Sequence, residues 1–287
     1  MAPHGSVARA AGLTAAPARV GRDGALSLRF ERRDGRSVLA GCRWTLPLQV
    51  LAPMALDDPA SIVYMLNPTG GLVGGDRLVI DVGVGAGAHA CLTTPSATKV
   101  YRTVAGPAEQ TVRLTLAPGA RLEWVPDHTI PFAGSAFHQR VHAEAPEGAA
   151  LVLIDAFAAG RVARGEAWRF SLLDSALSVR DARGWLLHDR LRLRDGAPGP
   201  GLGLAEDRPY VATVAVIGDA GVAAFVDDVA ALGGDDAEVG AGLLPRRGAL
   251  VRCLAADAPA LGRVLDGVWT AARRRVLGLA PLRLRKP

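Results

Sequence analysis

Cysteine and long apolar runs are scarce in this sequence of 287 residues. The three cysteines, Cys42, Cys91 and Cys253, are odd in number, scattered, and never form a C-x-x-C pair. Reduced thiols in a cytoplasmic protein are therefore expected. No apolar stretch approaches the roughly 18 residues that cross a bilayer. The N-terminal segment also lacks an unbroken apolar core, so the sequence predicts neither a membrane span nor a secretory signal.

Lysine is nearly absent too, because arginine supplies 31 of the 33 basic residues. The formal net charge of +5 is concentrated at the C-terminal end: residues 263–287 carry a net +6 and the rest of the chain a net −1. Apart from Trp269, no aromatic residue is interleaved with these arginines, so base stacking is not indicated. The basic end of the chain fits a helix that docks on an acidic protein surface as well as it fits a polynucleotide, and we expect no nucleic-acid partner.

Nucleotide-binding motifs are absent from the most glycine-rich stretch, LNPTGGLVGGDRL at 66–78. A P-loop needs a lysine after its last glycine, whereas Asp76 follows Gly75 and would repel a phosphate. The dinucleotide fingerprint is missing, and the next segment, RLVIDVGV, is typical of a strand rather than a helix. We interpret the stretch as a crossing between strands, where glycines permit close backbone packing.

Hydrolase signatures are missing as well. The pair His138 and His142 resembles a metalloprotease motif, but Gln139 stands where the general base is required. On the strand predicted here the two histidines lie roughly 13 Å apart, on a solvated face. No G-x-S-x-G elbow is present, and the scattered carboxylates are more often turn caps or surface residues. No motif commits the chain to catalysis.

Short β-rich runs recur about every ten residues from 26 to 157, separated by Gly, Pro and Asp, which predicts a mainly β sandwich, barrel or solenoid. Gly-Ala pairs open at 87, 119 and 148, in steps of 32 and 29 residues. This weak repeat favours stacked β-coils or a layered meander in a sandwich-like single domain, although ordinary hairpins produce a similar pattern.

The last third has helical periodicity. We predict helices at about 221–232 and 257–279, the second capped by Asp257. The predicted organisation is a flexible tail over 1–22, one β-rich domain over 23–279, and a flexible basic tail over 280–287.

Five stretches, taken in order, resemble the UreD family of urease accessory proteins, named UreH in some species. They are NPTGGLVGGDRL (67–78), TTPSATKVYR (93–102), GARLEWVPDHTIPF (119–132), GRVARGE (160–166) and VRDARGWLLHDRLRL (179–193). The resemblance runs over about 25–195 and continues more loosely to about 277. It implies stacked coils and sheets with two helices near the C-terminus.

The resemblance also implies a function. Members are not enzymes but scaffolds that bind the urease apoprotein and, with a UreF-type protein and a UreG-type GTPase, help to deliver nickel. In some members an internal water-filled tunnel carries the ion. The partner would hydrolyse GTP, which agrees with the missing P-loop. Tightly bound cofactors are not expected, only transient Ni²⁺.

Transfer of Ni²⁺ requires weak oxygen and imidazole ligands that release the ion, and the sequence holds no Cys/His cage. The candidates for the tunnel lining are five carboxylates, with two histidines behind them: Asp76, Asp81, Glu123, Asp155 and Glu166, then His89 and His128. The candidates for the partner surface are Lys99, Tyr101, Arg102, Trp269, Arg273 and Arg274.

Some positions depart from the family pattern. Asp127-His128 stands where Gln-Glu is expected, and Asp155 stands where Glu is frequent. The ending LRLRKP lacks an aromatic terminus. Two other functions stay open from the residues alone: a carbohydrate-active β enzyme with paired carboxylates, and a binder of anionic surfaces that acts through the basic tail.

Overall fold

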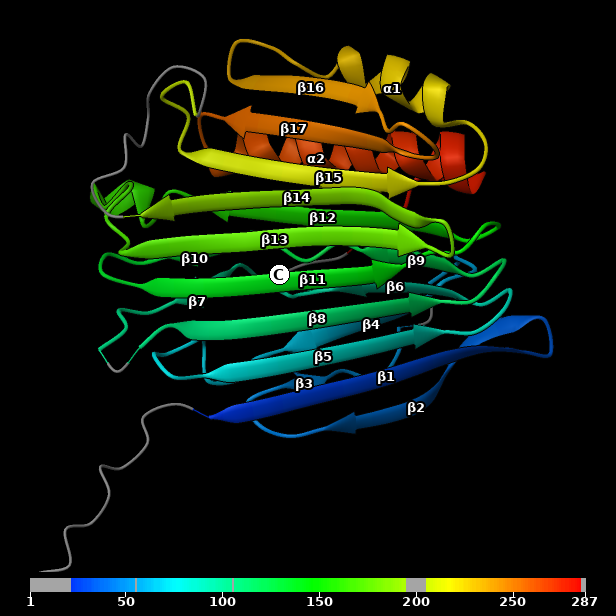
Figure 1. Cartoon of the computed structure of the whole chain (residues 1–287), viewed down its shortest axis with the longest axis horizontal. Helices are drawn as coiled ribbons and strands as arrows, with labels where there is room; N and C mark the ends of the chain where they lie inside the picture. Colours follow the sequence, from blue (N-terminus) through cyan, green and yellow to red (C-terminus); the bar gives the residue numbers. More distant parts are fainter. Residues whose placement is uncertain (1–21, 55, 105, 195–204, 285–287) are drawn as a thin grey trace, which may run out of the picture.

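The computed structural model describes residues 22–54, 56–104, 106–194 and 205–284. Of the two expected tails, 1–22 and 280–287, residues 1–21 and 285–287 lie outside the described residues. The described chain is mainly β and forms three layers: a seven-stranded sheet, a ten-stranded sheet behind it, and two helices on the far side of the second sheet (Figure 1).

The seven-stranded sheet has the order β14-β13-β11-β8-β5-β1-β2. Its strands from β13 to β1 pair in parallel, and an antiparallel hairpin closes each edge. The bounds of these strands are β1 Asp23–Arg33, β2 Arg36–Trp44, β5 Arg77–Val84, β8 Ala108–Leu116, β11 Ala136–Glu144, β13 Leu172–Asp181 and β14 Gly184–Arg194.

The ten-stranded sheet has the order β16-β17-β15-β12-β9-β6-β4-β3, with β7 and β10 paired off this path. Strands β4, β6, β9 and β12 pair in parallel, and β15, β17 and β16 continue antiparallel. The bounds are β3 Gln49–Val50, β4 Ser61–Leu66, β6 His89–Thr93, β7 Thr98–Val100, β9 Arg121–Trp124, β10 Thr129–Pro131, β12 Ala150–Ala158, β15 Tyr210–Ile217, β16 Ala237–Leu243 and β17 Ala249–Ala255.

The predicted repeat is confirmed as stacked β-coils. Each coil runs through one strand of each sheet and turns between them at a glycine: Gly87, Gly119 and Gly148 have φ of +67°, +73° and +80°. Such positive angles favour glycine because a Cβ would crowd the backbone. A Cβ built on Gly148 would lie 3.5 Å from the backbone nitrogen of Gly119, so the corners stack on one another.

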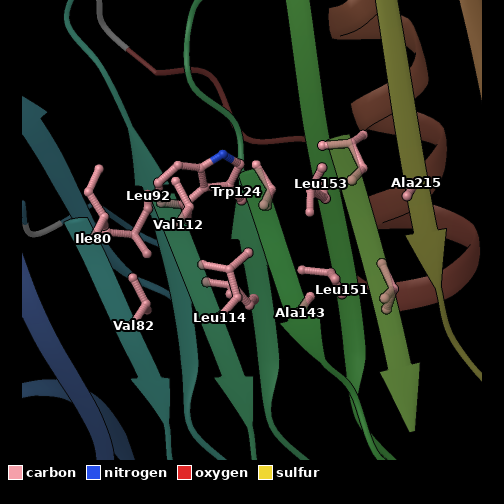
Figure 2. Packing of buried hydrophobic residues seen from close by; sticks show 14 of the residues in the cluster. Ile80, Val82, Leu92, Val112, Leu114, Trp124, Ala143, Leu151, Leu153 and Ala215 are labelled. Carbon is pink, nitrogen blue, oxygen red and sulfur yellow. The ribbon is translucent and has the colours of Figure 1, made fainter. Parts of the chain in front are cut away.

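The main core lies between the two sheets, because alternate residues of each strand point inward. In β5 the buried residues are Leu78, Ile80, Val82 and Val84. Figure 2 shows labelled side chains of both sheets, among them Trp124, packed in this space. Removing such apolar surface from water is the main force that holds the layers together.

The helices cover the other face of the ten-stranded sheet. Helix α1 spans Val222–Ala230 and α2 spans Ala258–Ala272, and their apolar faces form a second core with β12, β15 and β17. The Asp257 carboxylate caps α2 by accepting a 2.7 Å bond from the Ala260 N–H. The helical path continues as a π-helical turn, η2 (Arg273–Leu277), and ends at Gly278, whose φ is +65°. The short helix η1 spans Val162–Arg164.

No helix in the described part of the chain is long and apolar enough to cross a lipid bilayer.

Candidate functional site

The glycine-rich stretch forms a loop between β4 and β5, packed tightly against its neighbours. A Cβ on Gly71 would lie 2.5 Å from the Lys99 carbonyl oxygen. The Asp76 carboxylate accepts bonds from the backbone N–H groups of Arg22 (2.8 Å) and Val73 (2.9 Å). A strand follows the loop, which agrees with its interpretation as a close crossing. Both oxygens of Asp76 therefore serve to hold the loop in shape.

A cavity of about 240 Å³ lies next to this loop, with lining residues from both sheets. One wall consists of loop residues, including Asn67, Gly70 and Gly71, and part of the floor is apolar, with Ile80 and Trp124. The other lining residues include several polar side chains from separate strands and loops, among them Lys99, Gln110, Asp127, Gln139 and Asp155. Of the carboxylates proposed from the sequence, only Asp155 lines this cavity.

Asp155 lies on β12 and receives hydrogen bonds from the opposite sheet. Gln139 Nε2 donates to Asp155 Oδ1 at 2.7 Å, and Ser175 Oγ donates to Oδ2 at 2.8 Å. Gln110 Nε2 in turn donates to Gln139 Oε1 at 3.1 Å, which fixes the direction in which that amide donates. The chain of donors ends on the carboxylate as the acceptor.

The pKa of Asp155 is shifted because its side chain is enclosed by the protein. Burial raises the pKa of this carboxyl to about 6, against the lowering effect of the bonds from Ser175 and Gln139. Both direct partners are neutral, so no cation in contact compensates the charge. A cationic ligand that entered the cavity would meet a carboxylate that is hydrogen-bonded only to neutral side chains.

A larger cavity of about 960 Å³ lies between α2, residues 125–128 and residues 281–284. The two cavities share three lining residues, Ala97, Pro126 and Asp127. The adjacent His128 lines the larger one, with its ring 5.7 Å from that of Tyr210. Asp127 thus lies where the two cavities meet, and His128 lies on the side of the larger one.

Glu123 does not line either cavity, which differs from the expectation for a tunnel residue. It is fully buried on the helix-facing side of β9, where its oxygens accept bonds from His89 Nε2 (2.7 Å), Arg273 Nη1 (2.6 Å) and Trp269 Nε1 (2.5 Å). Burial acts to raise the pKa of Glu123, but bonding and charge from His89, with Arg273 and Trp269, outweigh it and the pKa is lowered.

Arg273 and Trp269, proposed as partner contacts, lie in the interior instead. Arg273 is 0% exposed, pairs with Asp58 as well as Glu123, and donates from Nε to the Ala280 carbonyl at 2.8 Å. The reason is helical spacing: position 273 follows Trp269 by four residues and shares its buried face. Only Arg274 of these three remains exposed.

The buried Arg273 also bears on the basic-tail alternative. Arg275 pairs with Asp228 at 2.7 Å and Arg263 pairs with Asp236. Three of the seven basic residues in 263–287 are thus committed to internal ion pairs, and the charge available to an external polyanion is smaller than the sequence indicates.

The other predicted site residues lie apart from one another. Asp81 is on the outer face of the seven-stranded sheet and pairs with Arg113 at 3.1 Å, while Glu166 forms a two-pronged pair with Arg161 at 2.7 and 2.5 Å. Lys99 is exposed at the cavity lining, and Tyr101 Oη donates to the Gly70 carbonyl at 3.2 Å. Arg102 is exposed beside Gly134.

Sequence reasoning missed Gln110, Gln139 and Ser175 as members of the site. The signal was present in the alternation: Gln139 occupies an inward position between Phe137 and Val141 on β11. A polar side chain at a position that should be apolar needs a buried partner, which here is Asp155.

Among the described residues, no group of three or more His, Cys, Asp or Glu side chains is arranged to hold a metal ion. Fold and site together define a protein of stacked β-coils with an internal, partly polar cavity. Compared with models of protein families, residues 22–287 match the family described as UreD urease accessory protein. The chain belongs to this family.

Curated relatives are similar to this chain along nearly its whole length. The chain is 35% identical to the urease accessory protein UreD of Deinococcus radiodurans over 269 residues, which cover 92% of this chain and 95% of the relative. It is 36% identical to UreD of Pseudomonas entomophila, covering 89% and 90%. It is 33% identical to UreD of Klebsiella aerogenes, covering 93% and 96%.

Proposed function

We propose that this chain is a non-enzymatic scaffold for urease maturation that binds the urease apoprotein together with UreF-type and UreG-type partners and helps to deliver Ni²⁺. The observation that carries the proposal is the match of residues 22–287 to the UreD urease accessory family. In this proposal the protein works in the cytoplasm, holds no tight cofactor, and leaves GTP hydrolysis to its partner.

Within this function, we assign the transient nickel contact to Asp155. Its carboxylate faces a cavity and has only neutral hydrogen-bond partners, whereas the other four candidates have oxygens already bonded to backbone N–H groups or to cationic side chains. Oxygen ligands in small number bind a borderline cation weakly, which suits transfer rather than storage.

The route that we propose continues to Asp127 and His128. Asp127 lines both cavities and His128 lines the larger one, so oxygen and imidazole ligands follow each other from the inter-sheet space towards α2. Asp76 and Glu123 would support this route only indirectly, by holding the glycine loop and the last helix in place.

Co-purification tests the scaffold. The tagged chain is co-expressed with the urease subunits and the UreF-type and UreG-type proteins of its host, and the eluate is analysed by size-exclusion chromatography. We expect the urease apoprotein to co-elute with the tagged chain. Consistent elution of the chain alone, with all the other components folded and present, would overturn the proposal.

Nickel-dependent urease activation tests the site. Asp155→Ala should lower the activated fraction, because the cavity loses a carboxylate whose hydrogen-bond partners are neutral. Asp81→Ala is the matched control, since Asp81 lies on the outer face of the sheet and half of its side chain is exposed (49%). Equal activation by both variants and the wild type would remove Asp155 from the route.

A further inference from the structure

The outer face of the seven-stranded sheet carries an uneven distribution of charge. Figure 1 shows this face towards the viewer, with no helix laid over it. On the β5 and β8 side each arginine has its own carboxylate: Arg113 pairs with Asp81 at 3.1 Å and Arg77 with Glu109 at 3.7 Å. The outer face of these two strands is electrically balanced.

The half formed by β11, β13 and β14 differs, because three arginines share one carboxylate there. We call it the basic face and define it by its central residues, Arg140, Asp174, Arg190 and Arg192, with His138. Arg190 Nε and Nη2 bond to the two Asp174 oxygens at 2.9 Å each, and Arg140 Nη2 bonds to Oδ2 at 2.9 Å. Arg192 Nε lies 4.0 Å from Oδ2, and His138 Nδ1 lies 3.2 Å from it.

Asp174 acts as the anchor of this set. It is 1% exposed, covered by the long side chains that fold over β13 from both flanking strands. The bonds from Arg190, with those from Arg140, hold the pKa of Asp174 far below its usual range, so it is ionised at neutral pH. The buried carboxylate fixes the guanidinium groups of Arg190 and Arg140 in place before any ligand arrives.

A net positive charge remains after this pairing. Three guanidinium groups against one carboxylate leave a net +2 on the set, and their side chains are 33%, 46% and 41% exposed for Arg140, Arg190 and Arg192. Arg194, further along β14 on the same outward row, is also exposed. A dication would be repelled here, so this face is separate from the proposed nickel route.

We propose that the basic face docks an acidic segment of a partner protein in the urease maturation assembly, an inference that rests on the proposed function. Because Asp174 occupies the Nε and Nη2 groups of Arg190, an external carboxylate would meet the remaining N–H groups of Arg190 and the guanidinium group of Arg192. An acidic protein segment fits better than a nucleic acid, because the adjacent strands β5 and β8, with Glu109 and Asp81, would bring carboxylates close to a long phosphate backbone. Docking driven by these charges weakens with ionic strength.

The test uses the double variant Arg192→Glu/Arg194→Glu, which leaves the close bonds of Asp174 to Arg190 and Arg140 untouched. The control with the same charge change is Arg36→Glu/Arg43→Glu on β2, the strand at the other edge of the sheet, where both residues are exposed. Affinities for the purified urease apoprotein, the UreF-type protein and the UreG-type protein are measured at about 50 mM and about 300 mM NaCl, two conditions that differ about sixfold in ionic strength.

We expect one component to bind the wild type in a salt-dependent manner, to bind the β14 variant about tenfold more weakly at low salt, and to bind the control normally. Unchanged affinity and salt dependence of the β14 variant for every component would overturn the docking proposal alone. A wild type that binds none of the components would overturn the proposed function as well. Duplex DNA is tested in the same way. If the β14 variant lost affinity for DNA and kept its affinity for every protein component, the face would be assigned to nucleic acid instead.

Discussion

Arg273 is the residue whose replacement tests the structural account most severely. Its guanidinium group joins four segments: Glu123 on β9, Asp58 on the loop before β4, the Ala280 carbonyl, and its own helix. Replacement by Met keeps the length and the apolar stem of the side chain. It removes the positive charge and leaves two buried carboxylates without their guanidinium partner.

The size of the expected loss of stability follows from the burial of these ion pairs. Breaking a buried ion pair by removing one partner costs about 3–5 kcal/mol, because the remaining charge is desolvated and unpaired. After the replacement Glu123 still accepts hydrogen bonds from His89 and Trp269. Asp58, whose side chain is 7% exposed, loses its ion pair with Arg273. We therefore expect a loss of about 4 kcal/mol in the free energy of unfolding, or roughly 10 °C in Tm.

The assay is urea and thermal unfolding followed by circular dichroism. Arg274→Met is the control, because the neighbouring arginine is exposed and should change stability by less than about 0.5 kcal/mol. The double variant Glu123→Gln/Arg273→Met should recover more than about 1 kcal/mol, since one unpaired charge is gone. A loss below about 1 kcal/mol for Arg273→Met, indistinguishable from the control, would refute the reasoning.

The remaining predictions concern the cavity and the glycine loop. The pKa of Asp155 is about 6 in the folded chain and near its ordinary value when unfolded, so the folded state holds more protons between these values. The free energy of unfolding should therefore fall by about 2 kcal/mol as pH rises from about 4 to 7. Asp155→Asn should flatten this profile in urea titrations, and parallel profiles of the variant and the wild type would contradict the prediction. Nickel affinity of the cavity should rise with pH up to about 6 in calorimetric titrations, because the ion competes with the proton. Gly71→Ala should cost about 2 kcal/mol in urea unfolding through its clash with the Lys99 carbonyl, whereas Gly262→Ala, a helix position with open space, should be neutral or stabilising.

The fold was predictable because its signals are local and repeated. Alternating strands, the Gly-Ala corners and the capping of α2 by Asp257 each follow from short-range chemistry. The helix end differed in detail: the final turn is π-helical over Arg273–Leu277, and the helical path closes at Gly278 instead of extending to 279. Such boundaries depend on tertiary contacts, here the bond of Arg273 to Ala280.

The site was only partly predictable because its contacts join distant positions. Glu123 and Arg273 are separated by 150 residues, and neither sequence neighbourhood indicates that they pair. Residue types alone therefore assigned one to a nickel route and the other to a partner surface. Asp155 was proposed from its residue type alone. Its partners Gln139 and Ser175 could be recognised only by combining polarity with the inward or outward position of each residue along its strand.

Activation of urease in a defined mixture tests the central claim most directly. Purified urease apoprotein, the UreF-type and UreG-type proteins, nickel and GTP are combined with and without this chain, and urease activity is measured over time. We predict activation that depends on the chain and is reduced by Asp155→Ala. Full activation in its absence would contradict a role for the chain in delivering nickel to urease.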